Sequence, residues 1–487
     1  MNENDIISKL EDLKSIKQTD INETTKALQT YQAGLKQDLV DTYSQYCPTK
    51  KRIRLLKNQN IYQGIMFQEV IVGANDEIIK YGDIFVSGGN ATTSGAGRVP
   101  ITAGFARVAI PQGVEIIDVI GGHANFFAQV KDSADMWVWG NNSEGCLGVG
   151  HNNAVPIPTK VTMSAKIKQI RSMSYLSANQ FCTILLEDGS VWSCGRNAEG
   201  QLGIGNTINS NRFVRVSVLE DIEEIWSGNN FVSGVFAKKG SKTYVWGWNG
   251  NGCLGLGKTN TPILAPELHP LANINKVYHY CLDWSGWKGL TYFEAGNAFY
   301  HAGFNGGRES GLDGGLGDNL SATEVFSSGI KASDQFVSSG IYGTALLLNS
   351  NHNVWSWGYG QFGFGENRTG NSLTQSLYAG VSFKSIHCKP YNQNAFYAQD
   401  FNGDLWSFGY NNYALGIGNA TDTRVWTKLP TPPNIIDYDV CSYYGTERVF
   451  IATDGERLYA CGVTLSWNLN YTTNVLQPQI LPLGEPK

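Results

Sequence analysis

The stretch VWSWG at residues 354–358 places two tryptophans two positions apart and ends on glycine. Residues two apart point to the same face of a β-strand, so the rings of Trp355 and Trp357 form an aromatic stripe on one side of a sheet. The glycine allows the chain to leave the strand with a positive φ. The stretch therefore predicts a strand with one apolar face, followed by a turn.

Variants of this stretch recur along the chain. They are MWVWG, VWSCG, YVWGW, FYHAG, VWSWG, LWSFG and LYACG, with their glycines at Gly140, Gly195, Gly247, Gly303, Gly358, Gly409 and Gly462. Successive glycines are separated by 55, 52, 56, 55, 51 and 53 residues. A near-constant period of about fifty residues is typical of a closed array of small sheets.

Each unit contains further shared features. An apolar pair comes first, such as Ile167 and Ile170, and a hairpin dipeptide such as Asp188-Gly189 precedes the tryptophan strand. A loop such as GNNSEGCLGVG at residues 140–150 and a last short strand then follow. Four strands per unit predict one propeller blade, and seven units predict seven blades.

This combination resembles the repeat of the regulator of chromosome condensation family. The matching pattern is the apolar pair, the hairpin and V-W-x-W-G-x-N-x-x-G-x-L-G-x-G, over roughly residues 114–487. It is specific in units one, two, three and six, whereas units four, five and seven depart from it in the loop after the glycine. The resemblance implies an all-β fold, a seven-bladed β-propeller of four-stranded blades.

Two expectations concern packing. Because the aromatic stripe recurs in most units, we interpret it as inter-blade core rather than as a ligand or light-sensing site. The C-terminal segment QPQILPLGEPK at 477–487 has no hairpin left to join, so we expect it to close the ring beside residues 116–120.

Composition excludes several classes of function. The net charge is −5 and the sequence pI is about 5.9, which does not indicate nucleic-acid binding. The sequence contains no run of eighteen apolar residues, so we expect no membrane insertion. The nine cysteines have no zinc spacing and are expected to be free thiols. With no recognisable catalytic set, we expect a protein that is not an enzyme and has no catalytic residues, cofactor or metal.

The residues before the repeats form two further parts. Residues 1–50 are predicted to be an N-terminal helical attachment or coiled-coil segment, because apolar residues recur at helical spacing between residues 5 and 46. Residues 51–112 are predicted to be a small β-rich collar or linker module, and residues 113–487 the propeller. The basic run KKRIRLLK at 50–57 is interpreted as a solvated junction, with a nuclear localisation patch as the alternative.

The order of these parts resembles a phage tail fibre or virion appendage protein. We therefore expect a non-enzymatic structural and binding protein of the virion tail, made in the host cytoplasm. Its partners would be other virion or tail proteins, through the N-terminal region, and a host-surface glycan or protein. The helical stripe needs a partner helix, so we expect a homo-oligomer such as a trimer. The alternative is an intracellular protein-interaction propeller, such as a guanine-nucleotide exchange factor or an effector.

The candidate ligand site lies in unit four, which departs most from the repeat. The segment YCLDWSGWKG precedes its hairpin and GFNGGRESGLDGGLGDN replaces its short loop. Trp284 and Trp287 would form an apolar platform, and Arg308, Glu309 and Asp313 would supply hydrogen bonds at its rim. The alternative is that the two tryptophans cap the core beneath a long loop.

Overall fold

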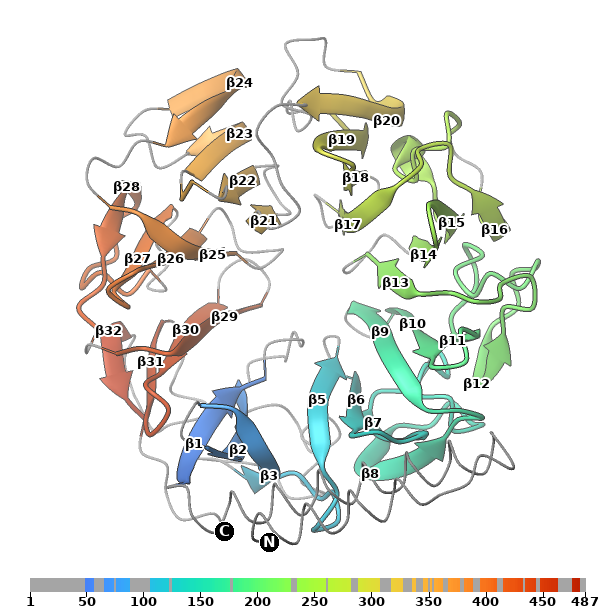
Figure 1. Ribbon diagram of the computed structural model, residues 1–487, viewed down its shortest axis with the longest axis horizontal. Coiled ribbons are helices and arrows are strands. Elements are labelled where there is room, and N and C mark those ends of the chain that lie inside the picture. The colour runs from blue at the N-terminus through green and yellow to red at the C-terminus, as the bar shows by residue number, and fades with distance from the viewer. Residues whose placement is uncertain are drawn as a thin grey trace, which may run out of the picture. The chain divides into compact units, whose positions relative to one another are not determined.

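The computed structural model describes most of the repeat region and part of the chain before it (Figure 1). The described residues are 49–56, 65–73, 76–87, 106–121, 125–175, 178–228, 234–259, 262–281, 288–306, 317–326, 335–338, 345–348, 351–352, 354–361, 367–376, 381–388, 395–409, 415–431, 434–443, 447–462 and 475–481. The chain divides into two compact units, residues 1–52 with 69–82 and residues 53–68 with 83–487. The helix predicted between residues 5 and 46 lies outside the described residues.

Seven of the four-stranded sheets come from the repeats, as predicted, and each uses four consecutive strands (Figure 1). We number these sheets as blades one to seven. The strands of blades one to four are β5 (Ile116–Gly121), β6 (Asn125–Val130), β7 (Asp135–Gly140), β8 (Val155–Thr162), β9 (Ile167–Tyr175), β10 (Ala178–Leu186), β11 (Val191–Gly195), β12 (Ser210–Arg215), β13 (Glu224–Ser227), β14 (Val235–Lys239), β15 (Lys242–Gly247), β16 (Ile263–Leu268), β17 (Ile274–Cys281), β18 (Gly289–Ala295), β19 (Ala298–Gly303) and β20 (Asn319–Phe326).

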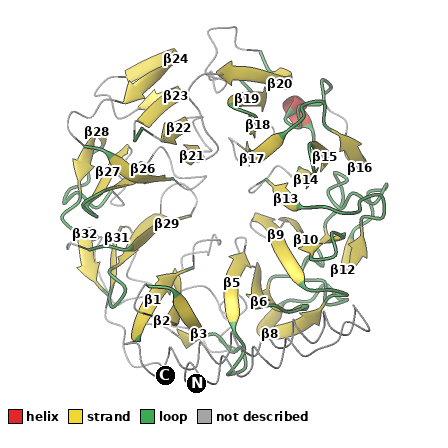
Figure 2. Ribbon diagram, in the orientation of Figure 1, coloured by secondary structure: helices red, strands yellow, loops and turns green. Residues whose placement is uncertain are grey.

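Blades five to seven continue the same order. Their strands are β21 (Gln335–Ser338), β22 (Ala345–Leu348), β23 (Val354–Gln361), β24 (Asn367–Ser376), β25 (Phe383–His387), β26 (Ala395–Asp400), β27 (Leu405–Gly409), β28 (Thr423–Lys428), β29 (Asp437–Tyr443), β30 (Glu447–Thr453), β31 (Leu458–Gly462) and β32 (Val475–Ile480). Figure 2 shows that strands and loops make up the described part, together with the short 3-10 helix η1 (Gly250–Gly252). The described part is therefore all-β, and the prediction of seven four-stranded repeat blades is confirmed.

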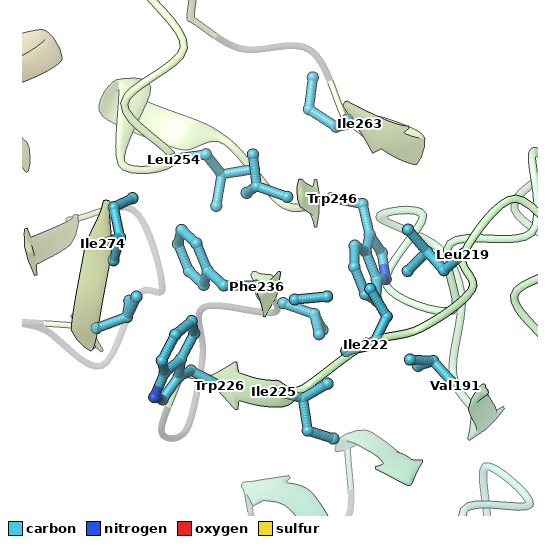
Figure 3. Close-up of a cluster of buried hydrophobic side chains, with 14 of the residues drawn as sticks. Val191, Leu219, Ile222, Ile225, Trp226, Phe236, Trp246, Leu254, Ile263 and Ile274 are labelled. Atoms are coloured by element: carbon cyan, nitrogen blue, oxygen red, sulfur yellow. The ribbon is translucent and has the colours of Figure 1, made fainter. Parts of the chain in front are cut away.

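The aromatic stripe lies in the core between blades. Trp357 is buried and Trp355 packs against the same cluster of side chains from blades four and five. In blade three, Trp246 and Phe236 lie in a cluster that joins side chains from blades two, three and four (Figure 3). Trp139, Trp246 and Trp357 are all at least 98% buried, which confirms the core interpretation for these three.

The glycine that ends the aromatic strand of blade two has a steric reason. Gly195 has φ +106, and a Cβ added there would lie 2.5 Å from the carbonyl oxygen of Gln180. An L-residue would therefore combine an unfavourable backbone conformation with a clash against the neighbouring strand.

Clusters of buried apolar side chains connect the blades in sequence. They join blades one and two, two to four, four and five, five and six, and six and seven. The last of these also contains Ile53, Leu55, Phe67 and Phe85. Another cluster joins blade one to Leu56, Met66, Ile84, Val86, Val108 and Ile110. These contacts therefore lead from blade seven back to blade one through residues that precede the repeats.

The predicted closure by the C-terminal strand is wrong. β32 pairs with β31 of its own blade, and β5 pairs with β6. Residues 477–480 of the predicted closing segment therefore complete the sheet of blade seven instead of pairing beside residues 116–120.

The residues before the repeats form one further four-stranded sheet. Its strands are β1 (Lys50–Leu55), β2 (Ile65–Val72), β3 (Ile78–Ser87) and β4 (Ala106–Arg107). Within the first unit, Lys51 lies 2.6 Å from Glu69 and Arg52 lies 2.7 Å from Asp76. The basic run at 50–57 thus includes a strand whose cations meet carboxylates.

Prolines interrupt several of the outermost strands. Pro156 and Pro158 lie in β8, Pro266 lies in β16 and Pro478 lies in β32. Proline cannot donate a backbone hydrogen bond, so within sheets it occurs mainly in edge strands such as these. Within the described residues, no helix is long and apolar enough to cross a membrane.

Candidate interaction surface

A buried asparagine organises the loop between the third and fourth strands of several blades. Asn142, Asn197 and Asn249 occupy the same position of the repeat, two residues after its glycine, and each is at most 1% exposed. Each side-chain oxygen accepts a backbone N–H five residues further on, from Leu147, Leu202 and Leu254 respectively, at 2.9 to 3.0 Å. The asparagine therefore holds the G-x-L-G part of the motif against the blade.

The amide nitrogen of the same asparagine fixes the far end of the loop. Asn197 Nδ2 donates to the carbonyl oxygen of Asn206 at 2.8 Å and to that of Ile208 at 3.2 Å. Asn206 Oδ1 in turn accepts the backbone N–H of Ile208 at 2.8 Å. Both polar backbone atoms of Ile208 are thus hydrogen-bonded within the loop, which fixes its backbone.

Each of these loops also contacts the next blade. Gly150 N donates to Asn211 O at 2.8 Å, Gly205 N to Leu264 O at 2.9 Å and Gly257 N to Leu320 O at 2.8 Å. These acceptors lie on the outermost strands β12, β16 and β20. We call residues 141–154, 196–209 and 248–259 the loop platform. It is fixed on blades one to four by repeated backbone hydrogen bonds.

The exposed side chains of the loop platform are mainly polar and uncharged. They include Ser143, Asn152, Asn153, Thr207 and Asn209. Ile208 lies among them and is 72% exposed, the largest value among the exposed large apolar residues of the described chain. The platform therefore presents an apolar side chain on a defined backbone, surrounded by hydrogen-bonding groups.

Charges near the platform are locally paired. Arg196 lies 3.3 Å from Glu199, and Lys258 lies 2.7 Å from Glu267. Asn209 Nδ2 donates to Glu144 Oε2 at 3.0 Å and links the loops of blades two and one. Within the described residues, Arg196 and Lys258 of the platform are thus each paired with a carboxylate.

The thiols beneath the platform are buried. Cys146, Cys182 and Cys194 are free and buried, and burial raises the pKa of Cys146 to about 12. A thiol with such a pKa stays protonated at neutral pH and is a poor nucleophile. Among the residues that the structure describes, no group of three or more His, Cys, Asp or Glu side chains could hold a metal ion.

The predicted ligand site falls outside the described residues. This applies to Trp284, Trp287, Arg308, Glu309 and Asp313, which therefore remain a prediction. Ile208 is not among the site residues predicted from the sequence, although it is the one apolar residue in the segment GNTINSN at 205–211. A lone apolar residue in an otherwise polar loop was the available signal.

Comparison with known proteins agrees with this architecture. Residues 134–178 and 188–234 match the regulator of chromosome condensation (RCC1) repeat. The chain is 26% identical over 368 residues to the ultraviolet-B receptor UVR8 of Arabidopsis thaliana, covering 72% of this chain and 79% of that protein. It is 29% identical over 143 residues to the human X-linked retinitis pigmentosa GTPase regulator, covering 29% of this chain and 13% of that protein.

A solved structure supports the fold. Yeast RCC1 (Prp20), in its complex with Kap60, superposes with a TM-score of 0.50 at 18% identity, over 73% of this chain and 85% of that chain. Two segments of the chain thus match the RCC1 repeat, and its repeat region has the β-propeller fold of yeast RCC1.

Proposed function

We propose that this chain is a non-enzymatic protein-interaction propeller that binds a partner protein through the loop platform. The observation that carries the proposal is Ile208, which is 72% exposed although its backbone is fixed by Asn197 and Asn206. Isolated exposed apolar residues are common on protein surfaces. Ile208 differs from such residues because hydrogen bonds already hold its loop in the absence of a partner.

A preordered loop favours binding for a physical reason. Association costs the entropy of fixing flexible side chains and loops, and this cost is lower when the loop is held before the partner arrives. An apolar anchor surrounded by polar groups is also the arrangement in which a few residues supply most of the binding energy. The paired charges of the platform favour a protein partner over a nucleic acid.

The relatives support the interaction alternative rather than the virion hypothesis. One relative is named a GTPase regulator and another a receptor, and the yeast structure is a complex with a second protein. A small GTPase is therefore a suitable first partner to test, with the chain as exchange factor or as effector. The virion-appendage hypothesis depends on residues 1–48, outside the described residues, and its tail partners, host glycan and trimer stay predictions.

The test compares Ile208 with a matched exposed isoleucine. Ile157 is 51% exposed on the outer strand β8, outside the platform. A photo-crosslinking residue placed at Thr207 would report partners in an extract of the source cells, in otherwise wild-type protein and with Ile208→Asp or Ile157→Asp. We expect the crosslinked partner to disappear with Ile208→Asp and to persist with Ile157→Asp. The same crosslinked products in all three proteins would contradict the proposal.

A second assay separates binding from exchange. The purified chain is added to a panel of small GTPases loaded with a fluorescent nucleotide, and nucleotide release is followed with time. Faster release that Ile208→Asp abolishes indicates an exchange factor that uses the platform. Binding without release indicates an effector or another regulatory partner.

A further inference from the structure

The sheet β1–β4 has a sequence signature of the repeats. The segment IFVSG at 84–88 has the same order of aliphatic, aromatic, small, small and glycine as VWSCG at 191–195 and LYACG at 458–462. Its glycine precedes Gly140 by 52 residues, within the 51 to 56 that separate the other repeat glycines. The segment IRLL at 53–56 likewise has the spacing of the apolar pair, with Ile53 and Leu56 both buried.

The first residue of this pair makes the hydrogen bond that the repeats make to the preceding blade. Ile167 N donates to Ser133 O at 2.9 Å, and Ile222 N donates to Gly189 O at 3.0 Å. Both acceptors lie in the hairpin of the blade before. Ile53 N donates to Gly455 O at 2.7 Å, and Gly455 is in the hairpin of blade seven. Ile53 thus follows blade seven as Ile222 follows blade two.

A glutamine on the second strand makes the matching bond to the following blade. Gln129 Nε2 donates to Ile167 O at 3.0 Å, from blade one to blade two. Gln399 Nε2 donates to Ile435 O at 2.6 Å, from blade six to blade seven. Gln68 Nε2 on β2 donates to Ile116 O at 3.0 Å, and Ile116 begins the first strand of blade one.

The residue after the outermost strand shows a third correspondence. Val216 N donates to Val191 O at 2.9 Å and Leu429 N donates to Leu405 O at 2.8 Å. Val108 N donates to Ile84 O at 2.8 Å, which places Ile84 at the position of Val191. This agrees with the alignment of IFVSG to VWSCG obtained from the sequence.

The side chains on the two faces of this sheet contact different blades. Phe67 and Phe85 stack at 5.2 Å between ring centroids and belong to the cluster that contains blade seven. Met66 and Ile84, their neighbours along the strands, belong to the cluster that contains blade one. A module attached to the outside of a seven-bladed ring would bury one face only. Burial of alternate residues against two different blades is the packing of a blade within the ring.

We propose that residues 50–110 are a diverged eighth repeat, and that the sheet β1–β4 is the blade that closes the propeller between blades seven and one. Each sheet consists of four consecutive strands, so no sheet combines strands from the two ends of the repeat region. The ring is therefore closed by side-chain packing and single hydrogen bonds between neighbouring sheets. This inference concerns the ring itself and does not depend on the proposed partner.

The test is hydrogen exchange in the blades on both sides of β1–β4. The double variant Ile84→Ala/Phe85→Ala in the full chain removes side chains that face blade one and blade seven. We expect amides of β6 and β30 to exchange about a hundredfold faster, because truncating two buried side chains leaves cavities in both interfaces. The control Leu458→Ala/Tyr459→Ala changes the same two repeat positions in blade seven and is expected to have an effect of the same order.

A milder variant covers the case in which the double variant does not fold. Gln68→Leu removes one inter-blade hydrogen bond, and Gln129→Leu removes its counterpart between blades one and two. Each is expected to accelerate exchange about tenfold, in β5 for Gln68→Leu and in β9 for Gln129→Leu. If Gln68→Leu leaves exchange in β5 unchanged while Gln129→Leu accelerates it in β9, β1–β4 is an appended module and the proposal is wrong. Unchanged exchange in β6 and β30 of a folded double variant leads to the same conclusion.

Discussion

Three histidines buried in and next to blade four are expected to make the protein sensitive to mild acid. His269 and His279 are 3% exposed and His301 is 0% exposed. Burial lowers the pKa of His269 to about 4 and those of His279 and His301 to about 3. In the unfolded chain each would have the ordinary value of about 6.5.

The sign of the effect follows from proton binding. Between about pH 4 and pH 6.5 the unfolded chain binds more protons than the folded protein, so the free energy of unfolding decreases as the pH decreases. At pH 5 the loss is about 2 kcal/mol for each histidine and about 6 kcal/mol for the three. This is comparable with the whole stability of many domains, about 5–15 kcal/mol. Asp188 acts at lower pH, because hydrogen bonds from Ser190 lower the pKa of its carboxyl group below the ordinary 3.8.

Urea unfolding followed by tryptophan fluorescence at pH 7.5 and pH 5.0 measures this loss. The free energy of unfolding at pH 7.5 minus that at pH 5.0 is expected to be about 2 kcal/mol smaller in His279→Gln than in the wild-type protein. Any loss of packing from the substitution lowers the free energy of unfolding at both pH values and therefore cancels in this difference. The exposed His151 provides the control, and His151→Gln should leave the difference unchanged. A difference in His279→Gln equal to that of the wild-type protein would refute the reasoning.

Three further outcomes are expected. Asn197→Ala should lower the free energy of unfolding, measured in urea, by about 2–4 kcal/mol, because it removes the hydrogen bonds that hold its loop. Asn152→Ala, at an exposed position, should change the free energy of unfolding by less than about 0.5 kcal/mol. Equal losses would contradict the organising role of Asn197. Gly148→Ala should lower the urea midpoint of unfolding more than Gly205→Ala. Both glycines have a positive φ, but an added Cβ would clash, at 2.3 Å from Phe213, only at position 148. Equal midpoints would show that the Phe213 side chain moves to relieve the clash. Trp284→Ala with Trp287→Ala should weaken binding to the partner or host surface at an unchanged melting temperature. The control is Ile436→Ala, at an exposed position before β29 and outside the loop platform. A lower melting temperature without loss of binding assigns the pair to the core.

The sequence predicted the repeat blades because their signal is periodic and rests on residue types that the fold requires. Gly195, with its positive φ and close backbone contact, is such a residue, and so are the buried Trp246 and Trp357. For residues 51–112 the sequence predicts a separate module, because Phe85 stands where most repeats have tryptophan and the G-x-L-G part of the loop motif does not follow Gly88-Gly89-Asn90. Its equivalence to a blade depends on bonds such as Gln68 to Ile116, which join residues far apart in the chain and have no sequence signature.

The loop platform was only partly predictable. The asparagine of the G-x-N motif is visible in the repeat sequence. Its side chain accepts a hydrogen bond from one end of the loop and donates one to the other end, and these two roles are visible only in the structure. The sequence marks Ile208 as a lone apolar residue in a polar loop, but it does not determine whether the side chain is exposed, because such an isoleucine can equally turn inward. Exposure depends on the backbone path that Asn197 and Asn206 impose.

The prolines of the outermost strands bear on how this protein behaves at high concentration. An unpaired strand edge can recruit another chain, and a propeller presents one such edge on the outside of every blade. Pro156 and Pro158 in β8, Pro266 in β16 and Pro478 in β32 each remove a donor from that edge. Blades one, three and seven are consequently poor templates for sheet extension. At high protein concentration, edge-to-edge strand pairing between molecules is therefore disfavoured at these blades.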